Sequence, residues 1–181
     1  MSLINTRQAY GWIAIALHWV SAVGVITLYL LGEQMEEATT RPDQIAAQAT
    51  HVSVGLLFIT FLATRLFWSF SQPHPESLER NLWLRRLGTA VHVVFLLMVL
   101  ALIVSGPLTV LSTGRPLAVF DWFAIPNPFG RVGWLHEAGE VVHKAAAKLF
   151  WPLIALHVGG ALKHLVVDRD RTLVRMLWAR S

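Results

Sequence analysis

The chain has 181 residues, of which 55% are hydrophobic and only 14% charged, and it contains eight Trp, eight His and no Cys. Because about a quarter of the residues in a soluble domain are charged, this composition indicates a membrane protein and excludes a disordered chain. The missing cysteine excludes disulfide frameworks, cysteine-ligated zinc, iron–sulfur clusters and covalently attached haem, so any metal must be bound by His or carboxylates. The net charge of +4 comes from basic residues scattered around apolar runs, which favours membrane topology and no nucleic-acid partner.

Four apolar segments are long enough to cross a bilayer, which takes about 20 helical residues. In chain order we expect the spans at about residues 11–31, 45–70, 87–111 and 135–167. The connections between them are short enough for neighbouring helices to run in opposite directions. The sequence therefore predicts an all-α protein, a membrane-embedded antiparallel four-helix bundle that forms a single domain over residues 1–181.

The distribution of Lys and Arg predicts the orientation of the bundle. With a cytoplasmic N-terminus, the cytoplasmic side collects the larger share: Arg7, Arg65, Arg80, Arg85, Arg86, Lys163, Arg169, Arg171, Arg175 and Arg180. The outer side keeps Arg41, Arg115, Arg131, Lys144 and Lys148. Because basic residues accumulate on the cytoplasmic side of membrane proteins, we expect both termini in the cytoplasm.

Four histidines within the spans fall into two pairs at matched depths. His18 and His157 lie about 10 and 15 Å from the cytoplasmic ends of their helices, and His51 and His143 both lie near the outer surface. The two histidines of the last helix are about 21 Å apart along its axis and point from one face. A lone membrane histidine is as often a packing residue, but matched pairs on facing helices are what a b-type haem with two axial ligands requires. The sequence predicts two such haems, one near each surface.

His136 competes with His143 for the outer position, since it lies on the same helix face. It stands about 31 Å from His157, which is the whole thickness of the hydrocarbon core. We therefore interpret His136 as an interfacial residue.

Three further polar residues lie toward the cytoplasmic surface: Arg65, His92 and His164. An arginine in a span matches a haem propionate, although snorkelling to lipid headgroups is an equal alternative. His92 and His164 could bind a propionate, accept a proton or line a quinone site, and for His92 structural packing is the alternative.

Several motifs, taken in order, resemble the bacterial cytochrome b561 family nearly from end to end. They are Leu17–His18–Trp19, His51–Val52–Ser53–Val54–Gly55, the loop from Gly114–Arg115–Pro116 to Phe129–Gly130, Ala155–Leu156–His157–Val158, Ala161–Leu162–Lys163–His164 and Asp170–Arg171–Thr172–Leu173–Val174–Arg175–Met176. The resemblance implies a four-helix bundle in the bacterial inner membrane that holds two b haems, with ligand positions at His18, His51, His143 and His157. In that family the outer ligand of the last helix is often followed by Glu, whereas here Lys144 follows His143 and the His–Glu pair is His136–Glu137.

The same resemblance implies a quinone-linked electron transferase, in which superoxide is oxidised at the periplasmic haem and ubiquinone is reduced. Two histidines per iron leave no open position, so such a haem transfers electrons rather than binding oxygen. A basic outer mouth formed by Arg115, Arg131, Lys144 and Lys148 would attract the superoxide anion, although contact with outer lipid or solvent is an equal alternative for the two lysines. The alternative is a dihaem anchor subunit that passes electrons between a partner dehydrogenase or hydrogenase and the quinone pool. A haem-free transporter or scaffold would leave the matched histidines unexplained.

Overall fold

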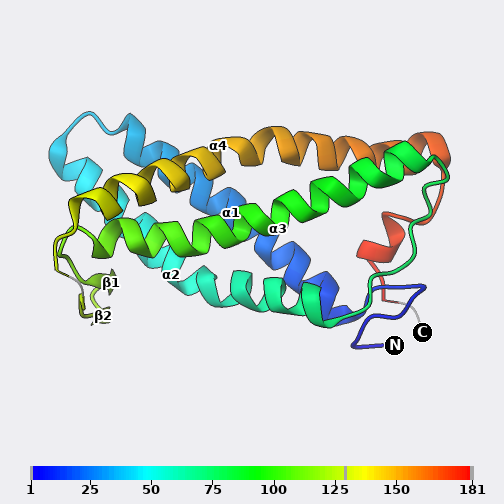
Figure 1. The fold of residues 1–181 in the computed structure, drawn as a ribbon, viewed down its shortest axis with the longest axis horizontal. Helices are drawn as coiled ribbons and strands as arrows, with labels where there is room; N and C mark the ends of the chain where they lie inside the picture. Colours follow the sequence, from blue (N-terminus) through cyan, green and yellow to red (C-terminus); the bar gives the residue numbers. More distant parts are fainter. Residues whose placement is uncertain (1, 129, 180–181) are drawn as a thin grey trace.

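Four long helices dominate the computed structural model, which describes residues 2–128 and 130–179 (Figure 1). Phe129 of the outer loop motif and Arg180 lie outside the described residues. The helices are α1 (Trp12–Glu37), α2 (Arg41–Ser71), α3 (Leu82–Leu111) and α4 (Gly133–Lys163), followed by a π-helical turn, η1 (His164–Asp168), and a short 3-10 helix, η2 (Val174–Met176). All four long helices have the length and apolar composition needed to cross a membrane. The predicted all-α four-helix membrane bundle is confirmed.

Two of the helices, α2 and α3, begin several residues before their apolar segments, at polar residues that cap them. Thr40 caps α2: its Oγ1 accepts a hydrogen bond from the backbone N–H of Asp43 at 3.3 Å and donates one to the Asp43 carboxylate at 2.6 Å. Asn81 caps α3 by accepting hydrogen bonds from two backbone N–H groups of its first turn. Such caps satisfy backbone donors that a helix start leaves unpaired.

The bundle consists of two helical hairpins, because α1 packs closely on α2 and α3 on α4, with fewer contacts between the two pairs. In the first hairpin the packing is so close that a Cβ on Gly24 would lie 2.3 Å from the ring of Phe58. The hairpins meet in a small apolar core of Leu62, Val99 and Phe150 at mid-bundle. Side chains that face each other across the two hairpins therefore become the candidates for a site.

A two-stranded antiparallel sheet closes one end of the bundle, where the α3–α4 connection folds back. Its strands are β1 (Leu117–Val119) and β2 (Phe123–Ile125). Ser53 of α2, 2% exposed, holds this hairpin: its hydroxyl accepts from the N–H of Phe120 at 2.8 Å and donates to the carbonyl of Ala118 at 3.4 Å. The sheet is thus attached to α2 two residues after His51.

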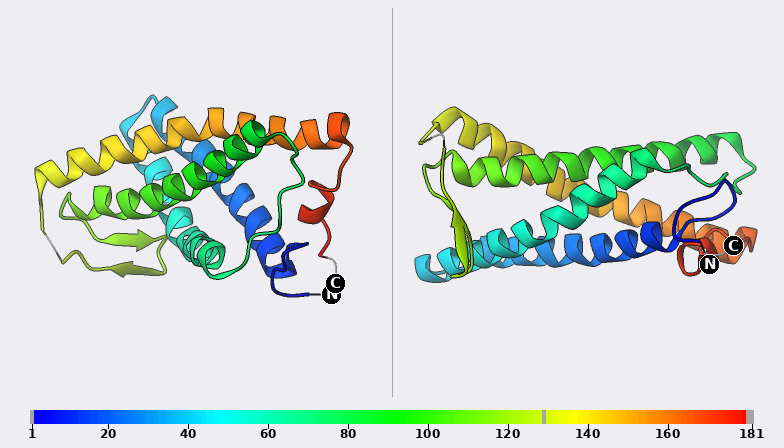
Figure 2. Two further views of the ribbon diagram at one scale, coloured as in Figure 1. Left: turned by 45° about the vertical axis from the view of Figure 1, so that its right-hand side comes forward. Right: turned by 90° about the horizontal axis from the view of Figure 1, so that it is seen from below.

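Both chain ends lie at the opposite end of the bundle, as an even number of spans requires (Figures 1 and 2). The indole N–H of Trp19 donates to the carbonyl of Met176 at 2.8 Å, and the Trp12 and Trp178 rings meet edge to face at 6.2 Å. The end with the termini is called the inner end below, and the end with the sheet is called the outer end.

Candidate functional site

At the outer end, the imidazole rings of His51 and His143 face each other from α2 and α4. Their centres are 6.1 Å apart and their planes are nearly perpendicular, at 85°. Both rings line a mostly apolar cavity between the four long helices. Such an apolar lining with a few convergent polar groups is typical of a cofactor site.

At the inner end, His18 of α1 faces His157 of α4, and their ring centres are also 6.1 Å apart. A third imidazole, His92 of α3, lies closer to His157, at 5.4 Å, and Phe95 contacts the same ring at 5.5 Å. The histidines that the sequence places at matched depths, His18 with His157 and His51 with His143, therefore face each other in the structure.

The ring separation of 6.1 Å in both pairs fits two imidazoles that bind one metal ion. Two imidazoles bound to opposite sides of one metal ion have their centres about 6 Å apart, because each metal–nitrogen bond is about 2 Å long. The separation between His92 and His157 is shorter than this and suits an edge-to-face ring contact. The donor set of two neutral nitrogens with no thiolate or carboxylate suits a haem iron.

Buried polar atoms without partners lie beside these pairs, which is the pattern expected where a polar cofactor belongs. Within residues 2–128 and 130–179 they are the hydroxyl of Ser21, the Nδ1 of His51 and the indole N–H of Trp68. Trp68 stands one helical turn from Arg65 on α2, and the Arg65 guanidinium also forms no hydrogen bond or ion pair with another described residue. Because a donor without an acceptor is costly in a buried place, the Arg65 guanidinium beside His18 and the neighbouring Trp68 indole are suited to an anionic ligand near the inner pair.

His136 lies apart from both pairs. Its Nδ1 is 2.9 Å from the carbonyl of Thr109, and its Nε2 is 3.8 Å from the carboxylate of Glu140. The structure therefore brings His143, rather than His136, against His51.

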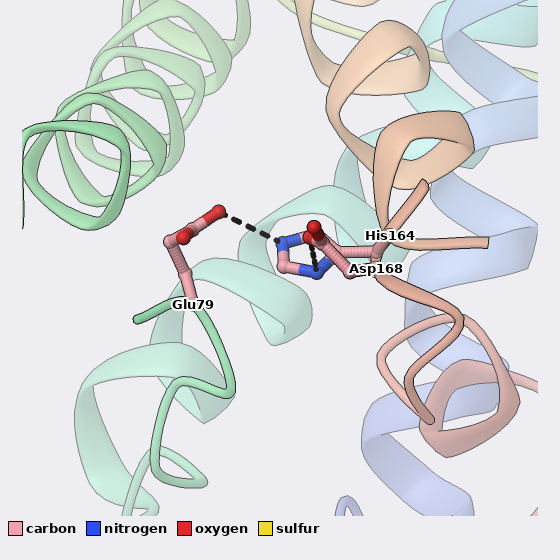
Figure 3. A group of neighbouring side chains, drawn as sticks. All are labelled: Glu79, His164 and Asp168. Carbon is pink, nitrogen blue, oxygen red and sulfur yellow. Dashed lines mark ion pairs between the residues drawn. The ribbon is translucent and has the colours of Figure 1, made fainter. Parts of the chain in front are cut away.

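Charged side chains form a network at the inner end, where Figure 3 shows Glu79, His164 and Asp168 directed toward one another. The Nδ1 of His164 lies 2.7 Å from Asp170 and 3.1 Å from Asp168, and its Nε2 lies 4.0 Å from Glu79. The ammonium of Lys163 pairs with Glu79 and with Asp168. Since this ammonium already joins the two carboxylates, the group is an ion-pair network rather than a metal site.

The network ties the α2–α3 connection to the end of α4. The hydrogen bond from Lys163 holds the pKa of the Glu79 carboxyl below its usual range. Burial raises the pKa of Asp170, but hydrogen bonds from Thr172 and His164 outweigh it, so the net shift is downward. Both carboxylates are therefore ionised at neutral pH.

The predicted basic mouth at the outer end is only partly free. Lys144 pairs with Glu140 at 2.9 Å and lies 3.9 Å from Glu36 of α1. Arg115 and Arg131 are exposed at this end, as is Arg41 at the start of α2. Lys148 lies five residues further into the bundle than His143 and two residues from Phe150 of the mid-bundle core, so the predicted place of Lys148 in the mouth is wrong.

Sequence reasoning missed two residues, Ser105 and Trp68. The Ser105 hydroxyl lies 3.1 Å from the Nδ1 of His143. In an apolar span a serine or a tryptophan is an ordinary packing residue, and its sequence position carries no signal that it faces a histidine or an empty polar site.

The same chain shows similarity to known proteins along almost all of its length. The family model for prokaryotic cytochrome b561 matches residues 9–179. The chain is 34% identical to cytochrome b561 homolog 2 of Escherichia coli (strain K12), over 100% of this chain and 97% of that protein. It is 24% identical to cytochrome b561 homolog 1 of the same organism, over 92% of this chain and 96% of that protein. It is also 24% identical to a Yersinia pestis protein named probable superoxide oxidase CybB, over 94% and 97% of the two chains.

A match of this extent, on a fold of four membrane-spanning helices, shows that the chain belongs to the prokaryotic cytochrome b561 family and is a multi-pass bacterial membrane protein that binds b-type haem and transfers electrons.

Proposed function

We propose that this chain is a dihaem cytochrome of the bacterial inner membrane that carries electrons from superoxide, at the periplasmic face, to ubiquinone. The observation that carries the proposal is that α4 supplies one imidazole to each of two pairs, at opposite ends of the bundle, with equal ring separations. The outer end is then periplasmic and both termini are cytoplasmic, which agrees with the bias of Lys and Arg.

In this proposal His18 and His157 ligate the inner haem, and His51 and His143 ligate the outer one. When bound, a haem with two imidazole ligands supplies one-electron transfer and offers no open coordination position. The four side chains fix the depth of each site, and the surrounding apolar side chains of the helices exclude water from it.

Arg65 and Trp68 hold the carboxylates of the inner haem. Both donors point from one side of α2 and lack protein acceptors among the described residues. The guanidinium fork and the indole N–H match carboxylate oxygens. His92 packs edge to face on His157 and keeps that ring in its orientation.

At the outer face, Arg115 and Arg131 attract superoxide by their local field. The similarity to a protein named probable superoxide oxidase supports this choice of donor. Lys144 adds little to the field, because Glu140 and Glu36 compensate its charge.

At the inner face, His164 takes part in the binding of ubiquinone or in the delivery of protons to it. The side chain is 16% exposed and lies within a group of carboxylates that can exchange protons with water. The expected result for His164→Ala is impaired quinone reduction with unchanged haem content, and His74→Ala, an exposed loop histidine, serves as the control. Loss of haem from His164→Ala would instead assign this residue to haem binding or to structure.

The decisive experiment uses the purified full chain with ubiquinone under a superoxide flux. Ubiquinone should be reduced, superoxide dismutase should abolish the reduction, and a pyridine haemochrome assay should give two b haems per chain. A haem-loaded chain that stays inert would overturn the superoxide reaction and favour the anchor-subunit alternative, in which a partner dehydrogenase or hydrogenase supplies the electrons. A chain that binds no haem b would overturn the whole proposal.

A further inference from the structure

We propose that Ser105 is a positioning residue for the outer haem ligand: its hydroxyl accepts a hydrogen bond from the Nδ1–H of His143, fixes the tautomer of the ring and lowers the reduction potential of the outer haem. The inference rests on the proposed ligand role of His143. It concerns a residue that touches the ligand and not the iron.

The contact between these side chains joins two helices. The Ser105 Oγ of α3 lies 3.1 Å from the Nδ1 of His143 on α4, and Ser105 is only 3% exposed. The backbone carbonyl of Leu102, one turn earlier on α3, is another polar neighbour of the His143 ring. The hydroxyl is thus the side-chain partner that the described structure provides for this side of the ring.

The backbone around Ser105 is shaped to admit the imidazole. A Cβ on Gly106 would lie 3.2 Å from the Cε1 and 3.5 Å from the Nδ1 of His143, so the missing side chain lets the ring lie against α3. One turn before the histidine, Gly139 brings α4 close, since its Cβ would lie 2.9 Å from the Oγ1 of Thr109. That hydroxyl donates to the carbonyl of Ser105 at 2.8 Å.

The hydrogen bond determines which nitrogen of His143 remains available. A neutral imidazole has one N–H donor and one lone-pair acceptor. With Nδ1–H donating to the serine hydroxyl, the lone pair resides on Nε2, the nitrogen that can bind iron. A group that accepts a hydrogen bond from the Nδ1–H makes the imidazole a more basic ligand through its Nε2. A more basic ligand stabilises the oxidised metal and lowers the reduction potential.

The opposite ligand of the outer pair lacks this support. The Nδ1 of His51 is buried and lies toward the Leu28 carbonyl of α1, but it has no partner with hydrogen-bond geometry within the described residues. The tuning of the outer haem by a side-chain hydroxyl therefore acts through His143 alone.

The test is a potentiometric titration of the haem-loaded full chain carrying Ser105→Ala or Ser105→Thr. The outer potential is identified as the one that disappears in His143→Ala. Ser105→Ala should raise the outer potential and leave the inner one unchanged, whereas Ser105→Thr, which keeps a hydroxyl, should stay near the parent value. Ser112→Ala is the matched control, because Ser112 is a buried serine at the C-terminal cap of α3 whose hydroxyl donates to the carbonyl of Thr109 instead.

Three outcomes overturn the proposal: an unchanged outer potential in Ser105→Ala, an equal shift in Ser112→Ala, or loss of the outer haem from both Ser105 variants. Loss of the outer haem from Ser105→Ala but not from Ser105→Thr would support the proposal, since threonine keeps the hydroxyl and alanine does not. A His143→Ala variant that keeps two haems would refute the ligand assignment itself, which is a separate failure.

Discussion

The outer and inner imidazole pairs have the same ring separation, 6.1 Å, but their surroundings differ in kind. Around His51 and His143 the polar contact is a neutral hydroxyl, and a glycine on α3 makes space for the ring. Around His18 and His157 lie a third imidazole and, on α2, the cation of Arg65.

This difference shows two ways of adapting one fold to one cofactor. A cation in a membrane span needs an anion, and among the described residues Arg65 forms no ion pair. In the proposed dihaem protein, the inner site would therefore be built by charge that the cofactor completes. The outer site would be built by shape and by one side-chain hydrogen bond.

The largest effect is expected from removing one histidine of each pair. His143→Ala should lose the outer haem and His157→Ala the inner haem, because an iron site with one remaining imidazole binds weakly. The haemochrome yield should fall from two haems to one in each variant, with His74→Ala unchanged. If either variant lost both haems, the two sites would depend on each other, and the outer and inner sites could not be treated as independently built.

An intermediate effect is expected at the charged side of the inner site. Arg65→Gln should lower the inner reduction potential, since the cation stabilises the site after it gains an electron, and should leave the outer potential unchanged. Trp68→Phe keeps an aromatic ring but would remove the proposed hydrogen bond to a haem carboxylate, of a kind worth about 1.5–3 kcal/mol, and should therefore weaken binding of the inner haem.

The inner and outer reduction potentials of Arg65→Gln, Trp68→Phe and the control Arg65→Lys are measured by redox titration. The inner reduction potential of Arg65→Lys should stay close to that of the parent, because lysine keeps the positive charge. If Arg65→Gln lowered the outer reduction potential and not the inner one, Arg65 would act on the outer haem and the assignment to the inner site would be wrong.

The smallest effect is expected at the ion-pair network of the inner end. Because Lys163 depresses the pKa of Glu79 below 4.5, the pair stabilises the fold fully above that value, and this stabilisation is lost as the pH falls through the lower folded pKa. Glu79→Gln should lower the thermal midpoint slightly at neutral pH and match the parent in strong acid.

Thermal unfolding of the parent, Glu79→Gln and Glu76→Gln at both pH values checks this prediction. Glu76 lies in the same connection and contacts its neighbours through backbone atoms. A constant difference between parent and Glu79→Gln at all pH values would contradict the assignment.

The spans and the depths of the histidines were accessible from sequence, because both depend on quantities that are nearly constant. Hydrocarbon thickness sets the length of an apolar run, and the helical rise converts residue number into depth. The pairs that matched in depth, His18 with His157 and His51 with His143, are those that the structure brings together.

What sequence could not predict depends on how the helices rotate and pack. Ser105 and His143 are 38 residues apart, and only the α3–α4 contact brings them together. Lys144 lost part of its expected role because Glu36, from the other helical hairpin, lies beside it. The sheet of β1 and β2 was absent from the prediction, since its three-residue strands are too short for a recognisable alternation.

The attachment of the outer sheet to α2 bears on how this fold can diversify. Ser53 forms hydrogen bonds to the loop through the N–H of Phe120 and the carbonyl of Ala118, which are groups that almost every residue provides. Exposed side chains of the loop, such as Trp122, can therefore change without altering this attachment, whereas Leu117 and Val119 are buried and fixed by packing. In the proposed function, selection for a new electron donor at this face could act on these exposed side chains alone, while the four helices stay as they are.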